Sequence, residues 1–349
     1  MKKYTSKTVY VGVDVHKKSY YVTAVSDKQI VKKDRLLADP HLLIEYCKNK
    51  FKGAEVSVAY EAGFCGFSLH RVLAGAGIQN RIVHPAGIEV AVRERVKNDR
   101  RDSEKIATQL AEGKLRGIHI PTVEREGFRE ISRLREDFVC KRNKVSAQIK
   151  SFLHRQGLFS EIDDKGLRKK KIMALMERKL SEDLSFTLRK LCEEWLYLNE
   201  QIEKIKERLE KQAEGDPLEM IYNSLPGVGA TIARILANEL GDMSQFSNEK
   251  QLFSYTGLTP REHSSGEHRW LGHISRQGKA LVRKMLVQAA WKAVGIDKGL
   301  EKKFGELSKR IGSRRAIVAI ARIMIGYARC CILENRMYEE RETTISAMA

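Results

Sequence analysis

The chain has 349 residues, enough for two or three domains that each bury a core, and its hydrophobic content of 42% is normal for globular proteins. With 64 Lys and Arg against 45 Asp and Glu, its formal net charge is +19, so we expect a polyanionic partner, either nucleic acid or an anionic membrane surface. The six scattered cysteines form no C-x-x-C pair, and there is no apolar signal region and no run of about 18 uncharged apolar residues, which argues against a zinc ribbon, secretion and a membrane span.

The first third, from Thr8 to about His119, has an α/β pattern. The stretches VYVGVDV, SYYVTAV and AEVSVAYE are typical of strands, whereas HLLIEYCKNK and FSLHRVLAGAG are typical of helices. The strands come in succession first and then alternate with helices, so we expect a sheet flanked by helices.

The middle of the chain, from Val123 to about Gly215, has almost no glycine or proline and many charges. Apolar residues recur there at alternating spacings of four and three, which predicts a coiled-coil arm. This seam comprises Leu184, Leu188, Leu191, Trp195, Leu198, Ile202, Ile205 and Leu209. An upstream apolar stripe from Ile131 to Phe152 could pair with it within the chain or across a dimer, and the basic run from Arg168 to Lys171 predicts a basic tip or loop between them.

The last third, from Leu225 onward, is predicted to be mainly helical. Its most apolar segment, Ala316 to Leu333, contains Arg322 and Arg329 and is expected to be a buried or amphipathic helix. The polar stretch PREHSSGEHRW, from Pro260 to Trp270, is the main irregular insert, and by itself it is either a surface loop or a loop that carries a nucleophilic serine.

Four acidic residues stand at the ends of elements in the first third. Asp14 ends the first strand, Glu61 ends a later one, and Asp99 and Asp102 are three residues apart at a helix start. Each residue alone is more often a cap or turn residue. Their order, however, is that of a ribonuclease-H-like nuclease core, in which the carboxylates would converge on one rim of the sheet. Oxygen ligands of this kind suit Mg²⁺ or Mn²⁺, and two ions about 3.5 to 4 Å apart would stabilise a phosphodiester displacement.

Several motifs resemble one family. The first third, with VGVDVHK, AYEAG and KNDRRDSEKIA, resembles the DEDD domain of the insertion-sequence 110 family of transposases, which are relatives of the Piv-type DNA invertases. The last third, with LPGVGATIARILANELGD, FSYTGLTPREHSSG and GHISRQGKALVRKMLVQAA, resembles the C-terminal domain of the same family. Small departures are Asn98, where relatives often have threonine, and Ser103, where alanine is usual.

The resemblance implies a fold class of α/β plus α in three domains. These are a RuvC-like DEDD domain over 1–120, a coiled-coil arm with a basic loop over 121–215, and a helical transposase domain with the catalytic serine over 216–349. The four acids of the family signature fall on Asp14, Glu61, Asp99 and Asp102, which would be both catalytic residues and ligands of Mg²⁺ or Mn²⁺.

The resemblance also implies a site-specific recombinase in which a C-terminal serine attacks DNA and forms a phosphoserine link. Motif position assigns this role to Ser265, with Ser264 as the alternative. A structured bridge RNA would guide the enzyme to donor and target DNA. Basic residues near the serines and in the arm are expected to bind nucleic acid, namely Arg261, Arg269, Arg276, Lys279, Arg283, Lys169 and Lys170.

The expected assembly is a homodimer or tetramer without a membrane partner, cytoplasmic in a prokaryote and associated with the nucleoid when it acts. Whether one chain or two supply the active site is open. Two other functions also fit the charge pattern. One is a metal-dependent, structure-specific DNA nuclease, similar to a junction resolvase, that uses the four acids and water without a covalent intermediate. The other is a non-catalytic nucleic-acid-binding scaffold.

Overall fold

The computed structural model describes residues 4–89, 99–158, 166–265 and 268–340. The chain forms two compact units, Met1–Ile120 and Pro121–Ala349. The boundary between them coincides with the first predicted domain boundary, whereas the arm and the C-terminal part fall in one unit.

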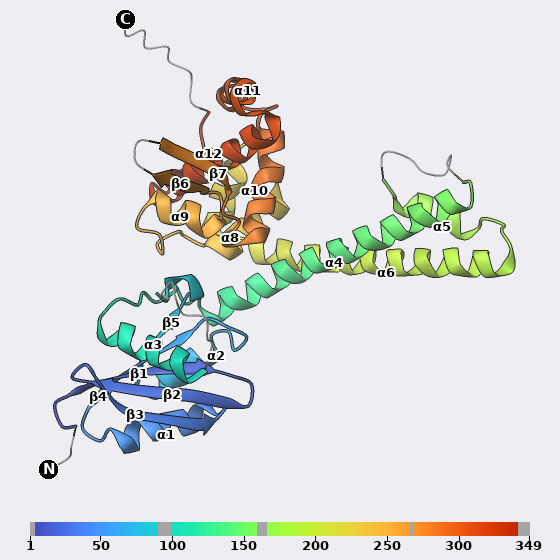
Figure 1. The fold of residues 1–349 in the computed structure, drawn as a ribbon. Coiled ribbons are helices and arrows are strands. Elements are labelled where there is room, and N and C mark those ends of the chain that lie inside the picture. Colours follow the sequence, from blue (N-terminus) through green and yellow to red (C-terminus); the bar gives the residue numbers. More distant parts are fainter. Residues whose placement is uncertain (1–3, 90–98, 159–165, 266–267, 341–349) are drawn as a thin grey trace, which may run out of the picture. The chain divides into compact units, whose positions relative to one another are not determined.

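The first unit contains a five-stranded mixed sheet with the strand order β3-β2-β1-β4-β5 (Figure 1). Strand β1 pairs antiparallel with β2 and parallel with β4, β2 pairs antiparallel with β3, and β4 pairs parallel with β5. The strands are β1 (Thr8–Val15), β2 (Ser19–Ser26), β3 (Gln29–Leu37), β4 (Glu55–Glu61) and β5 (Gln79–Val83). The helices are α1 (Pro40–Lys50), α2 (Ser68–Gly75), the short 3-10 helix η1 (Pro85–Gly87) and α3 (Asp99–Ala111).

The sheet buries both of its faces, and alternate residues of β1 point to opposite sides. Val9, Val11 and Val13 are fully buried in a core that also contains Leu43 of α1 and Leu69 of α2. The opposite face packs against α3 through a smaller cluster, formed by Ala59, Val83, Ile106, Leu110 and Leu115 with Tyr10 and Ile88 beside it. Helix α3 therefore lies on one face of the sheet and α1 and α2 lie on the other.

The arm of the second unit consists of two long helices that pack on each other within the chain (Figure 1). They are α4 (Val123–Arg155) and α6 (Glu182–Ala213), and the short helix α5 (Lys169–Met176) packs on α6. The basic run, predicted as a tip or loop, is helical from Lys169 onward, because Ile172 and Leu175 are buried in the arm and hold this helix against the long helices. Cys192, which is not part of the predicted seam, is also buried on α6, while Leu191 of the seam is half-buried and packs against the same core.

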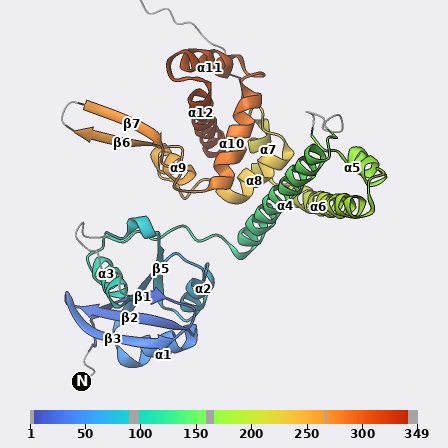
Figure 2. The same cartoon turned by 45° about the vertical axis from the view of Figure 1, so that its right-hand side comes forward.

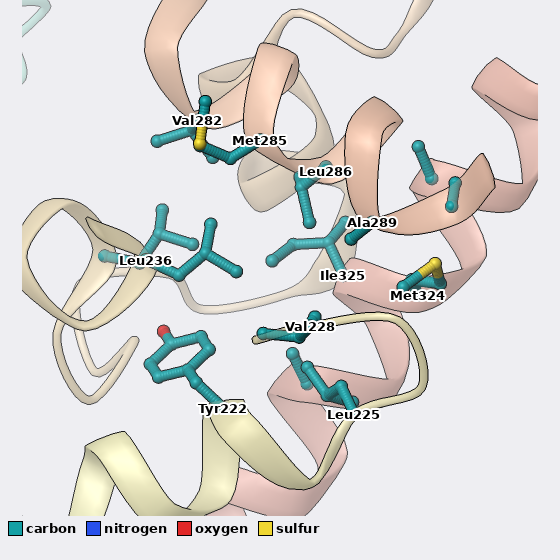
Figure 3. Packing of buried hydrophobic residues seen from close by; sticks show 14 of the residues in the cluster. Tyr222, Leu225, Val228, Leu236, Val282, Met285, Leu286, Ala289, Met324 and Ile325 are labelled. Atoms are coloured by element: carbon teal, nitrogen blue, oxygen red, sulfur yellow. The ribbon is translucent and has the colours of Figure 1, made fainter. Parts of the chain in front are cut away.

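The C-terminal part of the second unit is a helical core (Figure 3). Its helices are α7 (Pro217–Ser224), α8 (Ala230–Leu240), α9 (Glu249–Thr256), α10 (Ala280–Ala293), α11 (Lys298–Ile311) and α12 (Ser313–Leu333), and its strands are β6 (Pro260–Ser265) and β7 (His268–Ile274). Tyr222 is fully buried there, and its hydroxyl donates to the carbonyl of Gly241 at 2.9 Å. Among the described residues, α12 is long and apolar enough to cross a membrane, but Ile320, Met324 and Ile325 on it are buried in this core, as predicted for the segment.

Buried polar contacts tie the base of the arm to α8. The Arg129 guanidinium on α4 is buried and donates to the carbonyls of Asn238 at 2.9 Å and Glu239 at 2.8 Å. The amide of Asn238 in turn donates to the Ser132 hydroxyl at 2.9 Å. On burial these groups lose their hydrogen bonds to water, and only this geometry replaces them. The base of the arm is therefore held in one orientation on the helical core.

Candidate active site

The first part of the candidate site lies where β1 meets α3. Tyr10 packs in the cluster under α3, and two residues later Gly12 faces the same helix. A Cβ atom on Gly12 would lie 2.2 Å from the Ser103 carbonyl oxygen and 2.3 Å from the Ala107 amide nitrogen. Asp14 is the next residue on this face, because side chains alternate along a strand. Asp14 therefore lies on the sheet face that α3 covers, near the end of β1.

A buried hydrogen bond holds α3 in this position. Thr23 of β2 pairs with Gly12 of β1, and its hydroxyl lies 2.9 Å from the hydroxyl of Ser103 on α3. Ser103 is 1% exposed, so the bond is shielded from water. The Ser103 side chain therefore joins the helix to the sheet.

Glu61 reaches the same edge from the neighbouring strand. Strands β1 and β4 run parallel, and Val13 pairs with Tyr60, so Asp14 and Glu61 are the next residues of the two strands. Ala59, two residues before Glu61, packs in the cluster under α3. Glu61 therefore lies beside Asp14 on the sheet face that α3 covers, and its side chain is exposed.

Helix α3 brings the third carboxylate to this edge. Asp102 lies one turn before Ile106, whose side chain packs with Ala59 of β4, and its own side chain is 26% exposed. This places Asp102 on the flank of α3 that faces β4, the strand that ends at Glu61. Asp99 is the first residue of α3, and its side chain lies outside the described residues. Asp14 and Glu61 therefore lie at the same end of adjacent strands on the face covered by α3, and Asp102 lies on the flank of that helix nearest β4.

Two of the carboxylates have basic neighbours. The Asp14 carboxylate lies 3.1 Å from Nε2 of His16, and the Asp102 carboxylate lies 3.3 Å from Nζ of Lys105. The His16 ring packs edge-on against Tyr21 at 5.8 Å between centroids, so its position beside Asp14 is supported by β2. His16 was not among the predicted site residues, although it stands two residues after Asp14 in the motif VGVDVHK.

The donor set fits a hard divalent cation, because all of its members offer carboxylate oxygens. Across the described residues, however, no three His, Cys, Asp or Glu side chains are close enough together to hold a metal ion. Asp14 and Asp102 point to His16 and Lys105 in this arrangement. Metal binding would require these carboxylates to turn from their basic neighbours towards one another.

The second part of the candidate site is a β-hairpin, so the prediction of an irregular loop over Pro260 to Trp270 is wrong for the described residues. Strands β6 and β7 pair antiparallel, with Ser264 opposite Arg269 and Ser265 opposite His268 (Figure 2). Backbone pairing forms this ribbon without an alternating apolar face, which is why the sequence does not predict it. The two candidate nucleophiles stand at the outer end of β6, next to residues 266 and 267, which lie outside the described part. The side chains of residues 263–271, Ser264, Ser265 and Arg269 included, also lie outside it.

Close backbone packing fixes the base of the hairpin. A Cβ on Gly278 would lie 2.2 Å from the Tyr255 carbonyl oxygen, and one on Gly257 would lie 2.6 Å from Nη1 of Arg283. That same Nη1 donates to the carbonyl of Thr256 at 3.0 Å. The two strands therefore leave the helical core from a fixed base.

The basic residues predicted to bind nucleic acid differ in their surroundings. Burial lowers the pKa of Lys279, and nearby Arg133 and Arg129 lower it further, against the opposite effect of Glu239. Burial also lowers the pKa of Arg283, whose guanidinium holds a backbone carbonyl. By contrast, the exposed members of the set are Arg261, Arg276, Lys169 and Lys170.

Comparison with known proteins matches both parts of the candidate site to one family. A DEDD transposase model of the IS110 group, described as "Transposase", matches residues 11–156, and the model "Transposase IS116/IS110/IS902 family" matches residues 220–305. The first match contains all four acids and the second contains both serines. The chain belongs to the IS110 family of DEDD transposases. It is therefore a DNA transposase, and the predicted family and enzyme class are confirmed.

Relatives of this IS110-family enzyme come from several bacteria. The transposase for insertion sequence element IS1111A of Coxiella burnetii is 29% identical over 265 residues, which cover 74% of this chain and 72% of the relative. The transposase for IS1328 of Yersinia enterocolitica is 28% identical over 67% of this chain and 69% of its own length. The transposase for IS1533 of Leptospira borgpetersenii is 26% identical over 72% of this chain and 75% of its own length.

Proposed function

We propose that this transposase is a site-specific DNA recombinase that cuts and rejoins strands through a phosphoserine intermediate. The observation that carries the proposal is that Asp14 and Glu61 end neighbouring strands on the sheet face covered by α3, the helix that bears Asp102, in a chain that also has two serines at the end of a hairpin strand. The strand order and the position of α3 support a RuvC-like domain over 1–120, followed by a coiled-coil arm over 121–215 and a transposase domain over 216–349.

The four acids act as ligands in this proposal. Asp14, Glu61, Asp99 and Asp102 would hold Mg²⁺ or Mn²⁺, which when bound would stabilise charge on the attacking and leaving oxygens of the DNA phosphate. His16 would orient the Asp14 carboxylate through its contact at 3.1 Å. The close packing of α3 against Gly12 would hold Asp102 near the ends of β1 and β4.

The serine supplies the covalent step. The Ser265 hydroxyl oxygen attacks the scissile phosphorus, its proton passes to a base, and the P–O bond to the leaving DNA oxygen breaks as that oxygen takes up a proton. Glu262, His263 or a metal-bound group would serve as the base, and Ser264 is the alternative nucleophile. Because one phosphoester replaces another, the strand is resealed by the reverse attack without ATP. A nuclease that uses water would lose that bond.

The net charge of +19 supports nucleic acid partners. We propose donor and target DNA as substrates and a bridge RNA as the guide, with a homodimer or tetramer formed in the bacterial cytoplasm at the nucleoid. Arg261, Arg276 and the arm residue Lys170 are exposed cations suited to phosphate contacts.

A covalent adduct tests the serine step. We expect purified protein, incubated with Mg²⁺, the RNA co-expressed with it and DNA of the element ends, to form a protein–DNA adduct that survives a denaturing gel. Ser265→Ala should abolish the adduct, and Ser264→Ala should leave it. Loss of the adduct in Ser264→Ala alone would assign the nucleophile to Ser264. An adduct that survives each of the two changes would refute the serine assignment. Cut DNA with hydrolysed ends and no adduct would instead support the metal-dependent nuclease.

A further inference from the structure

A pocket of about 560 Å³ lies in the arm, is lined by none of the proposed catalytic residues, and is called the arm pocket here. It lies where α4, the start of α5 and α6 meet, a region that Figure 1 shows near the far end of the two long helices. Four cations line it, namely Arg142, Lys150, Arg168 and Lys169. No acidic residue of the described chain is among its lining residues.

The inner wall of the arm pocket is built from fixed side chains. Nη1 of Arg142 donates to Oδ1 of Asn199 at 2.7 Å, and its guanidinium lies over the Trp195 ring at 5.7 Å. The indole of Trp195 donates to the Ser146 hydroxyl at 2.9 Å. Arg142, Ser146 and Lys150 are spaced by four residues and share one face of α4. The arginine is thus held in place before any ligand arrives.

The start of α5 supplies the outer wall. Arg168 is the N-cap of α5 and Lys169 is its first residue, while Ile172 and Leu175 anchor the helix in the apolar core of the arm. Lys169 lines the arm pocket and its neighbour Lys170 does not. Two adjacent lysines, both exposed, therefore differ in whether they face the pocket.

Four cations around one cavity repel one another unless an anion joins them. Lys169 has a weak acidic neighbour in Glu200, whose pKa is lowered mainly by its bond to Lys204 at 2.6 Å and only secondarily by Lys169. Glu200 already has a lysine partner and does not line the pocket, so no described residue of the lining offers a balancing negative charge, which a bound anion would supply.

We propose that the arm pocket binds a single-stranded segment of nucleic acid, with a backbone phosphate between Arg142, Lys150 and Lys169. Guanidinium and ammonium groups suit a phosphate, and Asn143 and Asn199 offer amide groups to the attached nucleoside. A duplex presents its phosphates on a convex surface, whereas an unpaired strand can bend a phosphate and its nucleoside into a concave pocket. The inference rests on the proposed function only in taking nucleic acid as the ligand.

Two matched double variants of the full chain test this proposal. Lys150→Glu with Lys169→Glu changes the pocket, and Lys144→Glu with Lys179→Glu makes the same charge change outside it, at two exposed lysines of the arm. The probes are a short fluorescent RNA, single-stranded DNA of the same sequence and the DNA duplex. We expect the pocket pair to weaken single-strand binding about tenfold or more beyond the control pair. The slope of its binding constant against salt concentration should fall by about 0.7, because one lost phosphate contact on a single strand contributes about that much.

The RNA and DNA probes distinguish a ribose from a deoxyribose ligand. Equal losses in the two variant pairs, with unchanged thermal unfolding in both, would overturn the proposal, and so would a duplex that competes as well as the single strand. Adduct formation is scored separately. If single-strand binding differs between the two pairs but no adduct forms, only the serine chemistry is refuted. If an adduct forms but the two pairs bind single strands equally, only the arm-pocket proposal is refuted.

Discussion

Replacing Asp102 with asparagine should slow adduct formation and strand transfer by about a thousandfold or more, and Asp14→Asn should do the same. A carboxamide keeps the shape of the side chain but removes the charge that a divalent cation needs, and a thousandfold loss corresponds to about 4 kcal/mol of transition-state stabilisation. Initial rates measured at a fixed Mg²⁺ concentration, together with thermal unfolding curves, separate lost chemistry from lost folding.

Glu104→Gln is the matched control for these variants. Glu104 also lies on α3, but it faces β3, where its carboxylate bonds to Nζ of Lys33 at 2.6 Å. An exposed ion pair of this kind contributes little to stability, so the control should react at nearly the wild-type rate. Full activity in all of the variants of Asp14, Glu61, Asp99 and Asp102 would remove the metal-site proposal.

The second large effect is expected at Gly12. Gly12→Ala places a methyl group 2.2 Å from the Ser103 carbonyl, so α3 must move away from β1. Overpacking against backbone should destabilise the first unit by about 3 kcal/mol or more, and its melting temperature should fall by about 10 °C or more. Because the shift also carries Asp102 away from Asp14, activity should fall even at temperatures where the unit stays folded. Calorimetry and activity assays on the same preparation measure both effects.

Gly75→Ala is the control for this change. Gly75 lies in α2 of the same unit, and a Cβ there would meet nothing within 4 Å. The stability of the Gly75→Ala protein should be unchanged or slightly higher, because alanine favours the helix over glycine by up to about 1 kcal/mol. A Gly12→Ala protein that melts like Gly75→Ala would mean that α3 does not press on β1 as closely as described.

Strong local patterns made much of the fold predictable. The apolar runs that became β1, β2 and β4 are continuous because these strands are buried, and the helical periodicity of the arm extends over many turns. Strand β3 was missed because QIVKKDRLL is largely exposed and charged, and β5 was missed because only Ile82 and Val83 are buried in it. Edge strands such as these carry little apolar signal.

The candidate site was predictable only in part. Asp14, Glu61 and Asp102 were identified from their places at element ends, but their common face depends on the close packing of α3 at Gly12, which no local pattern predicts. A glycine within a buried strand is itself a sign of close backbone approach and could have indicated it. The hairpin of Ser264 and Ser265 was missed because β6 has no apolar side chain after Pro260 and the apolar residues of β7 do not alternate with polar ones.

Mn²⁺ binding by the full chain tests the central claim most directly, because it reports on the carboxylate cluster without depending on DNA cleavage. Titration followed by electron paramagnetic resonance should show about two bound ions per wild-type chain. The account predicts that Asp14→Asn and Asp102→Asn each lose this binding while Glu104→Gln keeps it. Equal Mn²⁺ stoichiometry and affinity in the wild type and in both aspartate variants would contradict it.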